Sequence, residues 1–227
     1  MTWIKICGTT NRDDALASVV AGADALGFIF APSPRAIRDD VAAAIITALP
    51  PAVETIGVFV NEPPLRVAAM AARVNLTGVQ LHGDEPAAAL AQYRAALGGR
   101  KIIKTLQARQ LLSSKGKLDG YLKVSYELDA ILLDAGSAEQ RGGTGVPFPW
   151  QEAAAIAAEI RQAVPLIVAG GLTPENVGEA IRLLVPAGVD VVSAVEATVG
   201  KKDAAKLRSF IDSVRKAGEM RTAAPSL

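Results

Sequence analysis

Lys5 and Cys7 lie two residues apart in the short apolar run Trp3–Cys7 near the start of the chain. Side chains two apart on a β-strand point to the same face, so the ammonium and the thiol are expected side by side. A nearby cation favours the thiolate, which would make Cys7 a usable base near neutral pH. The alternative is a small buried apolar cysteine, the commoner fate of a lone cysteine. The spacing leaves both interpretations open.

Two aspartates belong to later apolar runs. Asp134 ends the run Ala130–Asp134, and a partly buried carboxyl group there would have a raised pKa suited to a general acid. A helix cap or a salt bridge is an equal alternative for this side chain. Asp190 lies near the start of the run Val189–Ala194, where it would either reach a cavity or pair with Lys5.

Three further polar side chains stand at or near the ends of apolar runs. Arg35, in Ser33-Pro34-Arg35, is a candidate to hold a carboxylate through two parallel hydrogen bonds, with a solvent-exposed arginine as the alternative. His82 is the only histidine in the chain, and it would contact a substrate or bond to the loop backbone. Gln80, two residues earlier, is a further candidate for substrate binding.

Glycine-rich loops near the end of the chain predict a phosphate site. Backbone N–H groups can approach an anion closely at glycines, and a short helix starting near Glu196 would direct its positive end to the same place. A tight turn before a helix at Pro174 would also explain the glycine pair Gly170-Gly171. The candidates for phosphate binding are Gly143, Gly170, Gly171, Ser193 and Ala194.

The elements that must position these residues alternate between two types. Nearly continuous apolar runs are typical of parallel strands buried on both faces, and Ala-rich segments of helical spacing lie between them. The predicted strands are Trp3–Cys7, Ala25–Phe30, Thr55–Val60, Gly78–Leu81, Lys101–Leu106, Ala130–Asp134, Leu166–Ala169 and Val189–Ala194. The predicted helices are Arg12–Ala21, Asp39–Leu49, Pro63–Val74, Glu85–Leu97, Ala108–Ser125, Trp150–Ala163, Pro174–Val185 and Asp203–Lys216.

This alternation predicts an α/β fold, a single parallel eight-stranded (β/α)8 barrel of the TIM type. A doubly wound open sheet has the same alternation and is the alternative. The barrel domain is expected over residues 1–216, followed by a disordered tail over residues 217–227. Active sites of such barrels lie at the carboxyl ends of the strands, where nearly all of the polar and glycine-rich motifs fall.

Composition excludes several classes of function. The 24 basic and 23 acidic residues nearly balance and form no basic block, so nothing indicates nucleic-acid binding. One cysteine and one histidine cannot form a Cys/His zinc cluster, and no metal site is predicted. The single cysteine and the lack of a signal-peptide or membrane-spanning pattern favour the reducing cytoplasm and no membrane partner. Monomer and homodimer both remain open.

Taken in order, the motifs resemble those of the phosphoribosylanthranilate isomerase family of tryptophan biosynthesis, over about residues 3 to 212. The motifs are Lys5-Ile6-Cys7-Gly8, Gly27-Phe28-Ile29-Phe30, Ser33-Pro34-Arg35, Val58-Phe59-Val60-Asn61, Gln80-Leu81-His82-Gly83-Asp84-Glu85, Leu132-Leu133-Asp134, Gly142-Gly143-Thr144-Gly145, Ala169-Gly170-Gly171-Leu172 and Gly200-Lys201-Lys202-Asp203.

The resemblance implies an Amadori rearrangement of N-(5′-phosphoribosyl)anthranilate to 1-(2-carboxyphenylamino)-1-deoxyribulose 5-phosphate. It implies that Cys7 is the general base, that Asp134 is the general acid, and that Arg35 meets the anthranilate carboxylate. It also implies that Asp190 lines the sugar site. Both chemical steps are proton transfers that positioned side chains can perform, so no metal or cofactor is expected.

Some positions depart from the family's pattern, and related enzymes are alternatives. Ala194 replaces a usual glycine after the eighth strand, Ala135 follows Asp134 where a hydroxyl residue is usual, and Pro149 stands where aspartate is common. The histidine-pathway isomerase uses two aspartates, so Cys7 argues against it. The lysine-glutamate set of indole-3-glycerol phosphate synthase is not seen. A non-catalytic phosphosugar-binding paralogue is the alternative from another class, and Ala194 would be its first sign.

Overall fold

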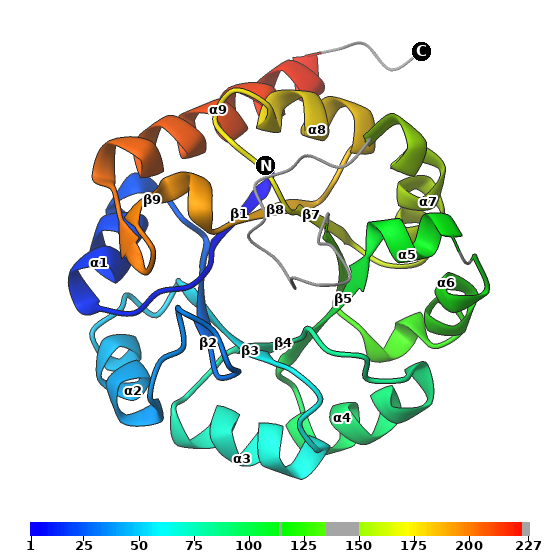
Figure 1. Ribbon diagram of the computed structural model, residues 1–227, viewed down its shortest axis with the longest axis horizontal. Helices are drawn as coiled ribbons and strands as arrows, with labels where there is room; N and C mark the ends of the chain where they lie inside the picture. The colour runs from blue at the N-terminus through cyan, green and yellow to red at the C-terminus, as the bar shows by residue number, and fades with distance from the viewer. Residues whose placement is uncertain (114, 135–149, 224–227) are drawn as a thin grey trace.

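The computed structural model describes residues 1–113, 115–134 and 150–223. Eight parallel strands form a closed barrel in the order of the chain, and helices surround it as an outer ring (Figure 1). The predicted (β/α)8 barrel is therefore confirmed, and the open-sheet alternative is wrong. The strands are β1 Trp3–Ile6, β2 Ala25–Ile29, β3 Glu54–Phe59, β4 Gly78–Leu81, β5 Lys101–Gln107, β6 Ala130–Asp134, β7 Leu166–Ala169 and β8 Gly188–Val191.

The helices that cover the barrel lie between these strands. They are α1 Arg12–Ala21, α2 Asp39–Thr47, α3 Pro64–Arg73, α4 Leu90–Leu97, α5 Ala108–Ser113, α6 Lys115–Leu122, α7 Trp150–Ala163, α8 Val177–Leu184 and α9 Ala204–Ala223. Short 3-10 turns are η1 Ala87–Ala89, η2 Ser125–Glu127 and η3 Ser193–Val195. After η3, the strands β9 Glu196–Thr198 and β10 Lys201–Lys202 form a small antiparallel hairpin. No helix of the described chain is long and apolar enough to cross a membrane.

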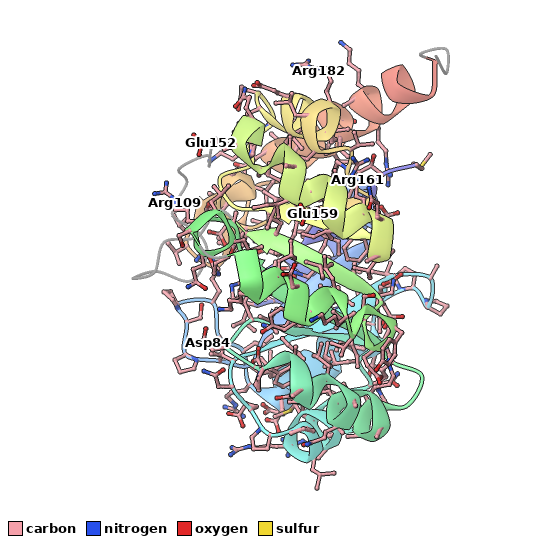
Figure 2. All side chains as sticks on the ribbon, turned by 90° about the vertical axis from the view of Figure 1, so that its right-hand side faces the viewer. Asp84, Arg109, Glu152, Glu159, Arg161 and Arg182 are labelled. Carbon is pink, nitrogen blue, oxygen red and sulfur yellow. The ribbon has the colours of Figure 1, made fainter. Side chains whose placement is uncertain are left out.

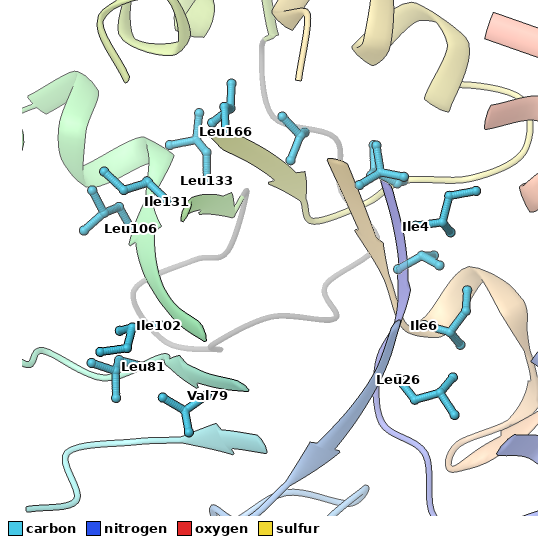
Figure 3. Packing of buried hydrophobic residues seen from close by; sticks show 14 of the residues in the cluster. Ile4, Ile6, Leu26, Val79, Leu81, Ile102, Leu106, Ile131, Leu133 and Leu166 are labelled. Carbon is cyan, nitrogen blue, oxygen red and sulfur yellow. The ribbon is translucent and has the colours of Figure 1, made fainter. Parts of the chain in front are cut away.

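The alternation of side chains along each strand separates two apolar layers. Ile4 and Ile6 of β1, like Ile131 and Leu133 of β6, pack in the layer between the sheet and the helices (Figure 3). The barrel interior holds a smaller cluster, made of Ala25, Ile56, Ile103, Ala130, Leu132, Ile167 and Ala169. The residues between the outward-facing ones therefore point inward, which directs Lys5, Asp134 and Asp190 to the barrel axis.

Charged side chains cover the outside of the helices. Figure 2 shows Glu152, Glu159 and Arg161 of α7 and Arg182 of α8 on the outer surface, and all four are exposed. These helices bury their opposite face, as Ala153, Ile156 and Ile160 of α7 do in the outer apolar layer. The helices thus shield the outer face of the barrel from solvent.

Four helix predictions need correction. The segment predicted as a helix over Glu85–Leu97 forms the 3-10 turn η1 and then α4, which begins at Leu90. The segment predicted as one helix over Ala108–Ser125 forms α5, α6 and η2. Helix α8 begins at Val177 and not at Pro174, because the side chain of Asn176 closes a turn before it: Oδ1 accepts from Thr173 N at 2.7 Å and Nδ2 donates to Gly171 O at 2.9 Å.

Helix α9 continues to Ala223, past residue 216 where the barrel domain was expected to end. Ala217 is buried, and its methyl group lies 3.8 Å from where a Cβ of Gly178 on α8 would stand. Packing of Ala217 against α8 stabilises the helix beyond residue 216. Residues 224–227 of the expected tail lie outside the described residues.

Val185 ends α8 in the left-handed conformation, with φ 49° and ψ 48°, and its N–H donates to Ile181 O at 3.0 Å. A Cβ makes this conformation unfavourable by roughly 1–2 kcal/mol, and glycine avoids that cost. We predict that Val185→Gly raises the free energy of unfolding by about 1 kcal/mol, as measured by urea denaturation. Val185→Ala removes the same methyl groups but keeps Cβ, so it should not gain stability. Equal stability of the two variants would contradict the explanation.

Candidate active site

A buried ion pair joins the first and last strands at the centre of the barrel. Lys5 lies opposite Asp190 in the pairing of β1 with β8, and its Nζ donates to Asp190 Oδ1 at 2.9 Å. Both side chains are buried. Of the two alternatives for Asp190, pairing with Lys5 is therefore the observed one.

Cys7 directly follows β1 and is buried, with its backbone N–H bonded to Val191 O at 2.9 Å. Burial raises the pKa of the Cys7 thiol, and the neighbouring Lys5 cation opposes this only in part. Burial alone would lower the pKa of Lys5, but Asp190 and Cys7 outweigh it and the ammonium stays charged. Lys5 thus favours the thiolate, as expected, but burial outweighs this effect and the net shift raises the pKa of Cys7.

Gly27 of β2 makes room for the thiol. A Cβ built on this residue would lie 2.5 Å from Cys7 Sγ, closer than any real contact, so no larger side chain fits without moving Cys7. The motif that contains Gly27 therefore has a steric role beside the cysteine. Sequence reasoning noted the motif but gave it no role.

Arg35 is largely buried: its side chain is only 15% exposed and forms an ion pair with Glu196 through two parallel hydrogen bonds. Nε donates to Oε1 at 2.8 Å and Nη2 donates to Oε2 at 2.7 Å. Within the described residues nothing accepts a hydrogen bond from Nη1, which leaves one edge of the guanidinium for another carboxylate. The predicted bidentate geometry is present, but in the free protein its acceptor is Glu196.

Asp134, His82 and Gln80 form a second polar cluster at the ends of β6 and β4. Asp134 is buried, and its Oδ2 lies 3.6 Å from His82 Nε2. Gln80 Nε2 is 3.0 Å from His82 Nδ1 and donates to Thr105 Oγ1 at 3.0 Å. An amide N–H facing Nδ1 puts the proton of a neutral imidazole on Nε2, the atom that faces Asp134. The imidazole of His82 thus lies among the side chains of Gln80, Thr105 and Asp134.

The predicted phosphate loops differ in one respect from expectation. Gly170 and Gly171 have φ of 84° and 66°, a conformation that glycine adopts without strain. Ser193 and Ala194 begin η3, whose first N–H groups have no acceptor within that turn. Glu196, however, starts strand β9, so no helix begins there. Ala194 is absent from the residues of positive φ, so its methyl group is not strained. Gly143 lies outside the described residues.

Two buried lysines were missed by sequence reasoning. Lys104 of β5 donates to Gly83 O at 2.9 Å and to Glu85 Oε2 at 2.9 Å, which ties the loop after β4 to the next strand. Lys202 of β10 donates to Cys7 O at 2.7 Å. In the sequence, the only signals were the place of Lys104 inside a predicted strand and the place of Lys202 inside the last family motif. Among the described residues, no three His, Cys, Asp or Glu side chains are grouped so as to hold a metal ion.

Comparisons with known proteins identify the family of this chain. The family described as N-(5'phosphoribosyl)anthranilate (PRA) isomerase matches residues 4–213. The chain belongs to this family. The N-(5'-phosphoribosyl)anthranilate isomerase of Pelobacter propionicus is 47% identical over 212 residues, which cover 93% of this chain and 94% of that protein.

Solved structures of the isomerase family have the same fold. The phosphoribosyl anthranilate isomerase of Thermotoga maritima superposes with a TM-score of 0.82 at 39% identity, covering 95% of this chain and 100% of that one. A second structure holds the isomerase in complex with reduced 1-(o-carboxyphenylamino)-1-deoxyribulose 5-phosphate. It has a TM-score of 0.79 at 38% identity and covers 95% of this chain and 100% of that chain.

The raised pKa of Cys7 predicts how the protein responds to pH. The folded state holds the thiol proton more tightly than the unfolded chain, so the thiolate should form at a higher pH than in an unfolded peptide. By linkage, the free energy of unfolding should fall as the pH rises through the unfolded value. The carbon-13 shift of Cys7 Cβ reports the titration, since the chain has one cysteine.

Lys5→Met provides the matched variant for this titration. Because the Lys5 cation lowers the pKa of Cys7, its removal should move the midpoint to still higher pH. A wild-type midpoint at or below the unfolded value would overturn this account of burial.

Proposed function

We propose that this protein isomerises N-(5′-phosphoribosyl)anthranilate to 1-(2-carboxyphenylamino)-1-deoxyribulose 5-phosphate in cytoplasmic tryptophan biosynthesis, with Cys7 as general base and Asp134 as general acid. One observation carries the proposal. A thiol and a carboxyl group are both buried at the carboxyl ends of strands of one barrel, in a chain of the PRA isomerase family. Active sites of such barrels lie at this end.

The first step opens the sugar ring. Asp134 protonates the furanose ring oxygen, the C1′–O bond breaks, and the nitrogen lone pair forms a Schiff base. The imidazole of His82, with Nε2 at 3.6 Å from Asp134 Oδ2, orients the carboxyl group, and Gln80 in turn orients the imidazole. A general acid works best when its proton is directed at the reacting atom.

The second step moves a proton from carbon. The Cys7 thiolate removes the proton from C2′, and the C–H electrons form the C1′–C2′ double bond and neutralise the Schiff base. The resulting enolamine becomes the ketone as its 2′-hydroxyl loses a proton and C1′ gains one. Lys5 and Asp190 lie beside the thiol and line the sugar site in this proposal. Because burial raises the pKa of Cys7, the thiolate is a minor species near neutral pH. On the acid side of the pH profile, the ratio kcat/KM should therefore rise with pH.

Binding at both ends of the substrate holds the ribose between acid and base. The open Nη1 edge of Arg35 meets the anthranilate carboxylate, while Glu196 holds the other edge. The amides of Gly170, Gly171, Ser193 and Ala194 meet the phosphate, and Gly143 is a further candidate. Such positioning of the reacting groups lowers the barrier to proton transfer. The partner is a small phosphoribosyl molecule, and monomer or homodimer both remain predictions.

The reaction can be followed as loss of the anthranilate fluorescence of the substrate. We predict that Cys7→Ala lowers turnover by roughly 10²–10⁴-fold, the usual contribution of a general base. Affinity for a product analogue should change little, because the thiol acts on one proton. The assay is run with and without a chelator, and equal rates are expected because the proposed steps are proton transfers by side chains.

The control for this variant is Gly116→Ala, an exposed change whose new Cβ meets nothing within 4 Å. It should keep wild-type turnover. If Cys7→Ala also kept it, Cys7 would be a packing residue and the base would lie elsewhere.

Asp134→Asn keeps the shape of the side chain and removes its titratable proton. We predict a large fall in turnover and loss of the high-pH limb of the pH profile, because that limb reports the acid. Steady-state rates from about pH 6 to about pH 9 measure both effects. Wild-type activity of this variant across that range would refute the role of Asp134.

A further inference from the structure

Lys202 is a buried cation whose ammonium lies between two functional groups. Its side chain is 1% exposed. Nζ donates to Cys7 O at 2.7 Å and to Glu196 Oε1 at 3.3 Å, with Val192 O at 3.4 Å. One ammonium therefore contacts the backbone of the proposed base and the carboxylate that holds Arg35.

Hydrogen bonds also hold the backbone of Lys202 in place. Its N–H donates to Asp14 Oδ2 at 2.7 Å, and it pairs with Glu196 across the hairpin of β9 and β10. The hairpin is also attached to the loop after β1, because Thr10 Oγ1 donates to Gly200 O at 2.6 Å. The ammonium thus has a defined place relative to β1.

Glu196 connects Lys202 to Arg35, because its carboxylate accepts hydrogen bonds from both side chains. Burial alone would raise the pKa of Glu196, but the hydrogen bonds from Arg35 and the charge of Lys202 outweigh it and lower the pKa. Glu196 is therefore ionised between two cations. The two hydrogen bonds from Arg35 to the Glu196 oxygens fix the plane of the guanidinium and leave Nη1 on its other edge.

Stability does not by itself explain a lysine at this position. Burial of charge is unfavourable, and well-packed apolar residues often replace buried ion pairs without loss of stability. Burial lowers the pKa of Lys202, and Glu196 opposes that effect. What an apolar side chain would not supply is a common donor for the Cys7 carbonyl and the Glu196 carboxylate.

We propose that Lys202 is a positioning residue that sets the base and the carboxylate-binding arginine in register across the substrate. It rests on the proposed roles of Cys7 and Arg35. Lys202 also adds a positive charge near the Cys7 thiol. The other charged groups near this thiol are Lys5 of β1, Asp190 of β8 and Arg35 of the loop after β2. Loss of Lys202 thus changes both geometry and charge at Cys7.

The test compares Lys202→Met with Lys201→Met, an adjacent exposed lysine of the same charge. Lys202→Met should lower kcat/KM by on the order of 10–10²-fold, the effect of a small misplacement of reacting groups. It should also move the Cys7 titration to higher pH. Lys201→Met should leave both unchanged. Lys202→Arg keeps a cation and should restore the titration midpoint, although not the full rate.

The readouts separate this proposal from the proposed function. The carbon-13 titration of Cys7 needs no activity, so it tests the contact of Lys202 even if Cys7 is not the base. An unchanged midpoint in folded Lys202→Met, or wild-type kcat/KM, overturns the positioning role. If Lys202→Met does not fold, Glu196→Gln replaces it. That variant should raise KM with little change in kcat, because Arg35 loses its charged partner, and an unchanged KM overturns the proposal.

Discussion

Closure of the barrel between β1 and β8 brings Lys5 opposite Asp190, and the remaining arrangement of the site depends on this pairing. The two strands are separated by almost the whole chain, and only ring closure makes them neighbours. Once their register is set, alternation along β1 places Cys7 on the same inner side as Lys5. The ion pair is buried inside the barrel, where an unpaired charge would be strongly unfavourable.

Buried lysines recur around the carboxyl end of the barrel. Lys5 pairs with a carboxylate on the neighbouring strand β8. Lys104 holds the loop after β4 against β5, and Lys202 holds the β9–β10 hairpin against the end of β1. Each cation is satisfied by a carboxylate together with, for Lys104 and Lys202, backbone carbonyl groups. Loops at the functional end of a barrel have little apolar surface to bury, so polar contacts of this kind hold them in place.

The fold was predictable because its signals are local and repeated. Apolar runs such as Leu166–Ala169 and Ala-rich helical segments recur through the chain, and eight repeats leave few architectures to choose from. Errors occurred where one side chain overrides a local pattern. Asn176 closes a turn that delays α8 past Pro174, and the packing of Ala217 extends α9 beyond the expected end.

The sequence by itself determined the eight strand–helix repeats, the motifs at the strand ends and the family resemblance, because periodicity and motif order are properties of the chain alone. It also identified Cys7 and Asp134 as residues of interest. That the eight strands close into a barrel and do not form an open sheet was decided by the tertiary structure. Only the tertiary structure decided that Arg35 is paired with Glu196, that Lys202 contacts Cys7, and that the pKa of Cys7 is raised. These facts depend on burial and on contacts between residues far apart in the chain. A linear pattern specifies neither the dielectric around a group nor the partner that closure of the barrel brings to it.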